Sequence, residues 1–264
     1  MKVFLLCGGR GFIHPESRQR IPKALSPVGA RPVLWHIMKT FATYGHTEFV
    51  LALGEGGDDI RQYFLQYSTH GRDVEVNVAQ GTVQYLNRIP EDNWRIKLIE
   101  TGLNAQAGSR LARCRQYLED ETFLLSYSDC LCNVNINQLL AFHRARGKLL
   151  TVTGIQPPSR FGTFLIQDEQ VIDYNLNARL TGMGGYINGG YMVMEPGLFD
   201  HVEPFNECML EREVFSHLVK IGQVAVYPHH GYWQSVDTER DILILSELDR
   251  TNQRPWLAEP DDLK

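Results

Sequence analysis

The sequence predicts an α/β fold built on a mainly parallel β-sheet with helices on both faces. Two observations lead to this expectation: short apolar runs alternate with amphipathic segments along most of the chain, and loops rich in glycine or proline separate them. Strands that alternate with helices pair in parallel, because each helix carries the chain back across the sheet. With 264 residues, 43% of them hydrophobic, the chain can bury the core of one such domain.

The order of the elements follows from these patterns. Residues 2–7 form a continuous apolar run, as a buried parallel strand requires, and a helix with proline in its first turn begins at Pro32. Further strands are expected at 49–53, 95–100, 123–127 and 149–155, and further helices at 58–67, 109–118, 136–146, 211–221 and 237–248.

Residues 161–194 depart from this alternation. Short strand-like runs with glycine turns predict a small antiparallel flap there. The tail after Thr251 is polar and carries two prolines, so we expect it to wrap the surface. We therefore expect a single domain over residues 1–264, with a flap at 161–194 and a C-terminal helical region and tail at 205–264.

Charge and cysteine content narrow the possible partners and the compartment. Twenty-six Lys and Arg against 31 Asp and Glu give a net charge of −5, which offers no reason to expect a nucleic-acid or membrane partner. Five cysteines do not form a disulfide framework, and the Cys130–Cys132 pair lacks a second pair of metal ligands, so buried thiols are expected. The N-terminal apolar run is too short for a signal peptide or membrane helix. A cytoplasmic protein is predicted.

The first strand leads into a glycine turn with basic neighbours. In Gly8-Gly9-Arg10-Gly11, bare backbone N–H groups can approach phosphate oxygens closely, although a tight turn without a ligand explains the glycines equally well. Arg10, Arg18, Arg20 and Lys23 concentrate positive charge in the same loop. This charge favours a polyphosphate ligand.

Two aspartates are candidate metal ligands. Asp129 follows the strand at 123–127, and Asp237 precedes the last helix. Mg²⁺ needs only one or two carboxylates when substrate phosphates fill its other positions. Each residue, taken alone, has a structural alternative: Asp129 as a turn cap and Asp237 as a helix N-cap. A metal site therefore requires that the fold bring the two together.

The chain resembles the sugar-1-phosphate nucleotidyltransferases over nearly its whole length, and most closely their glucose-1-phosphate cytidylyltransferase branch. Besides the glycine turn, the matching stretches are Arg31–Met38, Thr101–Gly102, Gly108–Leu111, Gln156–Gly162, Gly185–Gly190, Gly231–Gln234 and Asp237–Thr238. Each stretch is weak alone, but together they are specific for the family.

The resemblance implies a Rossmann-like core of the nucleotide-diphospho-sugar transferase type. Such a protein joins a nucleoside monophosphate, here CMP from CTP, to a sugar 1-phosphate or related phosphorylated acceptor and releases pyrophosphate, with Mg²⁺ as cofactor. In these terms Lys23 and Asp129 are catalytic, and Asp129 and Asp237 hold the metal. The implied nucleotide-binding residues are Leu6, Gly8, Gly9, Arg10, Gly11, Lys23, Arg110 and Ser128. Asn188, Gly189 and, as a stand-in cation, Arg179 would contact the acceptor. Homo-oligomers are known in the family and are possible here.

Several family motifs are altered. Phe12-Ile13 replaces the Thr-Arg that normally follows the glycine turn, and the Glu-Lys-Pro motif is missing from residues 173–181. Ser128 and Cys130 replace the glycines around the metal aspartate, and Ala105 replaces a threonine. Loss of one preorganised charged group costs about 10²–10³ in rate. Two hypotheses follow: nucleotidyl transfer with an altered substrate or binding mode, or an inactive homologue that binds nucleotide or a partner protein.

Overall fold

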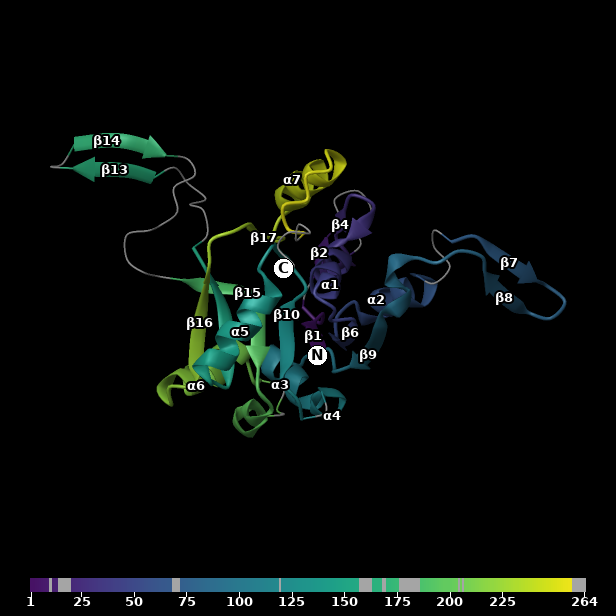
Figure 1. The fold of residues 1–264 in the computed structure, drawn as a ribbon, viewed down its shortest axis with the longest axis horizontal. Coiled ribbons are helices and arrows are strands. Elements are labelled where there is room, and N and C mark those ends of the chain that lie inside the picture. Colours follow the sequence, from purple (N-terminus) through teal and green to yellow (C-terminus); the bar gives the residue numbers. More distant parts are fainter. Residues whose placement is uncertain are drawn as a thin grey trace.

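The computed structural model describes residues 1–9, 11–13, 20–67, 72–118, 120–156, 163–167, 170–175, 186–203, 205 and 207–257. A seven-stranded sheet forms its centre, in the order β16-β12-β15-β10-β1-β6-β9 (Figure 1). Its strands are β1 (Lys2–Leu6), β6 (Glu48–Leu53), β9 (Arg95–Glu100), β10 (Phe123–Tyr127), β12 (Leu150–Ile155), β15 (Ile187–Met194) and β16 (Val224–His229).

The predicted parallel sheet is confirmed, with one antiparallel strand. β1 pairs in parallel with both β6 and β10, β6 with β9, and β12 with β16. β15 runs antiparallel between β10 and β12. All five residues of β1 are buried, because the strand lies in the middle of the sheet with both faces covered.

Helices cover both faces of the sheet. They are α1 (Val33–Thr43), α2 (Gly57–Tyr67), α3 (Ala107–Arg113), α4 (Arg115–Leu118), α5 (Ile136–Arg146), α6 (Ser216–Lys220) and α7 (Glu239–Arg250), with 3₁₀ turns η1 (Lys23–Leu25), η2 (Pro90–Asn93) and η3 (Pro196–His201) and the π-helix η4 (Leu210–Phe215). The helix expected at 109–118 is divided at Cys114, and that at 211–221 begins as the π-helix.

Two hydrophobic cores lie on opposite faces. Val3 and Leu5 of β1 pack into the core that contains α1, α2, α5 and α7, whereas Phe4 and Leu6 pack into the core with α3, α4, η4 and α6. The period of two along the strand sends alternate side chains to the two cores. This doubly covered sheet fixes where the strand ends lie, and hence where a site can form.

Five small antiparallel sheets accompany the central one. They are β2 (Phe12–Ile13) with β3 (Arg20–Ile21), β4 (Pro27–Val28) with β5 (Arg31–Pro32), β7 (Val74–Asn77) with β8 (Thr82–Tyr85), β11 (Cys130–Cys132) with β17 (Trp233–Ser235), and β13 (Thr163–Gln167) with β14 (Gln170–Asn175). The expected flap at 161–194 is thus divided: β13 and β14 pair with each other, but β15 belongs to the central sheet.

The β7–β8 hairpin was not among the predicted elements. In Figure 1 it projects away from the sheet. Val74 lies opposite Tyr85 and Val76 opposite Val83, so one face of the hairpin is apolar, and all four side chains are exposed. The polar residues between them share the other face, as the period of two requires.

The C-terminal segment enters the core, which corrects the expected surface tail. Trp256 is fully buried, and its indole Nε1–H donates to His36 Nδ1 at 3.2 Å. His36 Nε2 in turn lies 3.1 Å from the carbonyl oxygen of Val28. Burial against α1 stabilises this large aromatic ring, and the neighbouring Leu257 packs against the same core. No helix in the described ranges is long and apolar enough to cross a membrane.

Candidate functional site

A cavity of about 210 Å³ opens where β1 and β10 end, and it gathers most of the predicted site residues. Ligands of open α/β sheets bind at this edge. The lining consists of Leu6, Cys7, Gly8, Gly9, Lys23, Ala24, Ala105, Gln106, Ala107, Arg110, Tyr127, Ser128 and Asp129. Six of the eight residues that the resemblance assigned to the nucleotide therefore line one space, and Gly11 is not among them.

The glycine turn forms one wall of this cavity. A Cβ added at Gly8 would lie 2.3 Å from the guanidinium carbon of Arg110, and one at Gly11 would lie 1.9 Å from the carbonyl oxygen of Ile21. At Gly9, by contrast, a Cβ would meet nothing within 4 Å. Gly8 and Gly11 are therefore required by close packing, whereas Gly9 faces open space. Arg10 lies outside the described residues.

Arg110 holds the glycine turn through a hydrogen bond to the Gly8 carbonyl oxygen. Its side chain donates to the carbonyl oxygens of Leu53 at 2.7 Å, Gly102 at 2.9 Å and Gly8 at 3.0 Å, and to the Thr101 hydroxyl at 2.6 Å. The residue is 4% exposed, and burial lowers the pKa of the guanidinium from its ordinary value. These bonds tie β1, β6 and α3 together at the cavity, a structural role that the sequence did not predict. The nucleotide contact expected of Arg110 stays a prediction.

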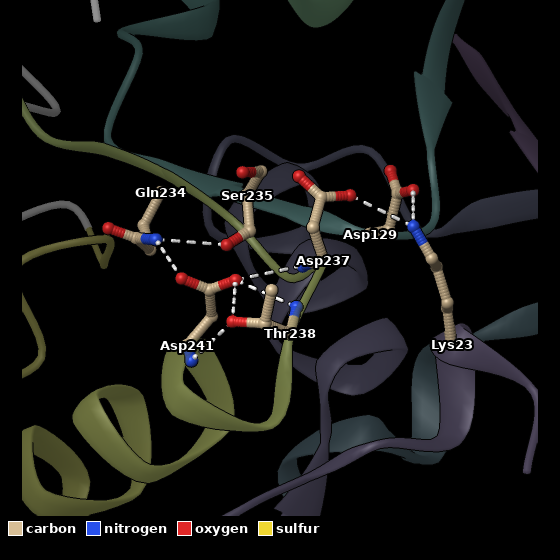
Figure 2. A network of polar contacts seen from close by, with 7 residues as sticks. All are labelled: Lys23, Asp129, Gln234, Ser235, Asp237, Thr238 and Asp241. Atoms are coloured by element: carbon tan, nitrogen blue, oxygen red, sulfur yellow. Dashed lines mark hydrogen bonds and ion pairs between the residues drawn. The ribbon is translucent and has the colours of Figure 1, made fainter. Parts of the chain in front are cut away.

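Lys23 joins the two candidate metal ligands. Its Nζ lies 2.9 Å from Asp237 Oδ1 and 3.5 Å from Asp129 Oδ2 (Figure 2). Lys23 begins η1, Asp129 follows β10, and Asp237 precedes α7, so three distant segments converge. The side chains are 27%, 35% and 40% exposed for Lys23, Asp129 and Asp237. Lys23 and Asp129 line the cavity, whereas Asp237 is joined to it through its bond to Lys23.

The electrostatics of this group are coupled. Burial alone would lower the pKa of Lys23, but the Asp237 and Asp129 carboxylates raise it above its ordinary value. Burial raises the pKa of Asp129 against the lowering effect of Lys23, and the nearby Asp237 raises it further. Two carboxylates in one partly buried site favour a cation between them.

The chemistry of these side chains fits Mg²⁺. Asp129 and Asp237 supply hard oxygen ligands and already share one cation, the Lys23 ammonium. In the part of the chain that the structure describes, no group of three or more His, Cys, Asp or Glu side chains could hold a metal. A magnesium ion here would thus depend on substrate phosphates and water for its remaining ligands.

The residues around Asp129 pack tightly. The Ser128 hydroxyl donates to the Leu6 carbonyl oxygen at 2.8 Å and so ties the ends of β10 and β1 together. The Cys130 and Cys132 thiols are buried and free, and burial raises the pKa of Cys132 to about 12. Burial likewise raises the pKa of Cys7 in the cavity wall to about 12. These cysteines are therefore protonated at neutral pH and are poor nucleophiles.

The predicted acceptor residues lie beside the cavity. Asn188 Nδ2 donates to the Tyr127 hydroxyl at 3.2 Å, and the Gly189 carbonyl oxygen accepts from Trp233 Nε1 at 2.8 Å. Tyr127 lines the cavity and its hydroxyl also bonds the Glu211 carboxylate. Sequence reasoning missed Tyr127 and Glu211, although the position of Tyr127 directly before Ser128 at a strand end was a usable signal.

Of the arginines near the altered family motifs, the structure describes some and not others. Arg20 pairs with Glu55 at 3.3 Å and donates to the Gly11 carbonyl oxygen at 3.4 Å. Arg18, Arg179 and the side chain of Ile13 lie outside the described residues. Ala105 lines the cavity, as expected from its alignment with the family threonine.

Fold and site together define a nucleotidyltransferase-type α/β protein, and comparisons with known proteins identify its family. No protein-family model matches the chain. It is 38% identical to the probable glucose-1-phosphate cytidylyltransferase of Bacillus subtilis over 97% of this chain and 99% of that one. It is 34% identical to glucose-1-phosphate cytidylyltransferase of Salmonella typhi, over 97% and 98%.

Structural comparison agrees on the fold. The crystal structure of HddC from Yersinia pseudotuberculosis superposes with a TM-score of 0.65 at 16% identity, over 93% of this chain and 98% of that one. The chain belongs to the sugar-1-phosphate nucleotidyltransferase family. The predicted fold class and the resemblance are thereby confirmed.

Proposed function

We propose that the protein transfers CMP from CTP to a sugar 1-phosphate or a related phosphorylated acceptor and releases pyrophosphate. The observation that carries this proposal is the convergence of Lys23, Asp129 and Asp237, of which Lys23 and Asp129 line the same cavity as Gly8 and Gly9. The choice of cytidylyl rests on the relatives above, which are named glucose-1-phosphate cytidylyltransferases over nearly their full length. Residues 1–264 act in this proposal as one catalytic domain.

The chemistry requires alignment and charge stabilisation more than covalent help. The triphosphate lies along the glycine turn, where the close-packed backbone at Gly8 and the open space at Gly9 leave room for phosphate oxygens. A phosphate oxygen of the acceptor attacks the α-phosphorus in line. A new P–O bond forms while the bond to pyrophosphate breaks. The Lys23 ammonium neutralises charge on the phosphates as it develops.

Asp129 and Asp237 would hold the Mg²⁺. Bound there, the ion supplies positive charge to phosphate oxygens and fixes their orientation. Lys23 contacts both carboxylates that would bind the ion, and we infer that its ammonium moves toward the phosphates when the substrate complex forms. The lysine thus keeps two neighbouring carboxylates ionised and in place until then.

On the acceptor side, Asn188 and Gly189 form the sugar pocket of this proposal. The Asn188 side chain is fixed at both ends, since its Oδ1 accepts from the Gly190 N–H at 2.8 Å and its Nδ2 donates to Tyr127. Such a fixed amide can present a defined hydrogen-bonding edge to a hydroxylated substrate. Arg179, the stand-in for the missing phosphate-binding lysine, remains a proposal from sequence.

A second function is favoured by the altered motifs. Ile13 in place of the family arginine and the missing Glu-Lys-Pro lysine remove cations that bind the two substrates. A protein without them could bind nucleotide, or a partner protein, without turnover. The retained Lys23, Asp129 and Asp237 support catalysis instead, because binding alone does not require two carboxylates around one cation.

Pyrophosphate release measured with CTP, UTP, dTTP, ATP and GTP against a panel of sugar phosphates separates the two functions. We expect Mg²⁺-dependent release that is greatest with CTP and one sugar 1-phosphate. CTP binding by calorimetry without turnover for any acceptor would support the inactive homologue. Turnover that is unchanged in Asp129→Ala would show that the proposed metal site is wrong.

A further inference from the structure

Asp241 lies in the first turn of α7, four residues after Asp237, which pairs with Lys23. Its Oδ2 accepts hydrogen bonds from the backbone N–H groups of Thr238 at 2.8 Å and Asp237 at 3.1 Å, and from the Thr238 hydroxyl at 2.8 Å. Its Oδ1 accepts from Gln234 Nε2 at 3.1 Å. Figure 2 shows this carboxylate directed at the chain that carries Asp237, on the side away from Lys23.

Part of this network is an ordinary helix cap. Thr238 is the N-cap of α7, and it forms a reciprocal capping box with Asp241. An acidic side chain in the first turn also interacts favourably with the helix dipole. Neither effect requires the bonds from the Asp237 N–H and from the Gln234 side chain, which reach the chain before the helix begins.

These two additional bonds hold the chain that leads into Asp237. Gln234 belongs to β17, which pairs with β11 directly after Asp129, and the Val236 N–H donates to the Asp129 carbonyl oxygen at 2.8 Å. Asp241 thus connects α7 to the short sheet that follows Asp129. Polar groups that orient a metal-binding side chain through its backbone commonly change metal affinity by about 10–100-fold when removed.

We propose that Asp241 is a positioning residue, which holds the Asp237 carboxylate opposite Asp129 and Lys23 and thereby sets the affinity of the site for a divalent cation. This inference rests on the proposed function, because it takes Asp237 as a metal ligand. It adds that the metal affinity depends on a residue whose carboxylate is directed at the backbone and not at the cavity.

Mn²⁺ binding to the protein of residues 1–264 in complex with α,β-methylene-CTP tests this directly, through the EPR signal of free Mn²⁺ compared with that of the analogue alone. We expect Asp241→Ala to weaken binding about 10–100-fold. Thr238→Ala is the matched control: it removes the capping hydroxyl but keeps Asp241 and its bond to the Asp237 N–H. It should lower the unfolding temperature as Asp241→Ala does, yet change Mn²⁺ affinity less than threefold. Equal Mn²⁺ binding by Asp241→Ala and the wild type overturns the inference.

A second pair of variants covers the case in which Asp241→Ala does not fold. In Asp241→Asn the amide oxygen can still accept from Asp237 and Thr238, but its NH₂ faces the Gln234 NH₂. Adding Gln234→Glu restores a donor opposite an acceptor. We expect weakened Mn²⁺ binding in Asp241→Asn and recovery in the double variant. A double variant that binds no better than Asp241→Asn contradicts the inference.

Asp237→Ala separates the metal-binding role of Asp237 from the positioning role of Asp241. If Asp237→Ala binds Mn²⁺ as the wild type does, the metal role in the proposed function fails and the positioning role fails with it. If Asp237→Ala loses binding but Asp241→Ala does not, only the positioning role fails. The Mg²⁺ concentration for half-maximal pyrophosphate release should follow the same order as the Mn²⁺ affinities.

Discussion

Among the described residues, two cations line the cavity, Lys23 and Arg110, and they are held in opposite ways. Lys23 is 27% exposed and bonds two carboxylates. In the proposed complex a metal binds these carboxylates, and a triphosphate replaces them as the partner of the Lys23 ammonium. Arg110 is 4% exposed and bonds backbone carbonyl oxygens and a threonine hydroxyl, which stay in place whatever binds. A cation beside a ligand cavity is therefore not by itself a ligand-binding group. The hydrogen-bond partners of the cation decide whether it can bind a ligand or stabilises the fold.

The largest expected difference between these walls is in turnover. Lys23→Ala removes the charge nearest the phosphates and leaves Asp129 and Asp237 facing each other. We expect kcat/KM to fall about 10²–10³-fold, as for other preorganised charges at a transition state, with little change in unfolding free energy, because partly exposed ion pairs contribute little. Steady-state kinetics and urea denaturation measure both. Lys220→Ala, on the exposed surface of α6, is the control. Retention of more than a tenth of the activity contradicts the assignment.

Arg110 should show the reverse pattern. Arg110→Ala removes the donor to the buried carbonyl oxygen of Gly8, so we expect a loss of about 1–3 kcal/mol in unfolding free energy. The Leu53 carbonyl oxygen keeps its bonds from the N–H and hydroxyl groups of Thr101. Arg110→Lys should recover only part of this loss, since one ammonium cannot reproduce the planar fork. Urea denaturation provides the measurement. A stable Arg110→Ala protein with weakened CTP binding would instead assign Arg110 to the nucleotide.

Within the glycine turn, Gly8 and Gly9 separate the same two roles. Gly8→Ala places a methyl group against the hydrogen-bonded guanidinium of Arg110, so we expect about 1–3 kcal/mol of destabilisation from overpacking. Gly9→Ala meets no neighbouring atom and should leave the unfolding free energy unchanged. Because Gly9 lines the cavity, its methyl group should weaken CTP binding in calorimetry. Equal destabilisation by both variants would contradict the packing argument.

Local patterns predicted the part of this fold that depends on local sequence. The buried run at Lys2–Leu6 and the position of Asp129 after Tyr127 predicted a site at the strand ends where the structure has a cavity, and the functional roles of these residues stay predictions. The role of Arg110 could not be predicted, because two of its acceptors lie at residues 8 and 53, which are 102 and 57 residues away.

Two other regions show why the remaining predictions were incomplete. β15 enters the central sheet through pairing with β10 and β12, which no local period reveals. Trp256 is buried against α1, and its hydrogen-bond partner His36 lies 220 residues away, a contact that no local pattern reveals. The β7–β8 hairpin, in contrast, has a regular alternation around Gly81 that a period-two search would have detected.

The smallest expected effect is the change in the free energy of unfolding that the ionisation of Asp129 produces as pH changes. Burial raises the pKa of Asp129, Lys23 opposes the increase and Asp237 adds to it, so the folded protein favours the protonated form. At pH below the unfolded pKa of about 3.9 the carboxyl is protonated in both states and has no effect on stability. As pH rises past the raised folded pKa, the ionised group costs stability, because the unfolded chain releases the proton more readily.

Asp129→Asn should therefore match the wild type in acid and become equally or more stable than it near neutral pH, while losing turnover. Thermal unfolding of both proteins between pH 4 and 8 measures the difference, and an Asp129→Asn protein that is less stable only at neutral pH would show that the Lys23 pairing outweighs burial.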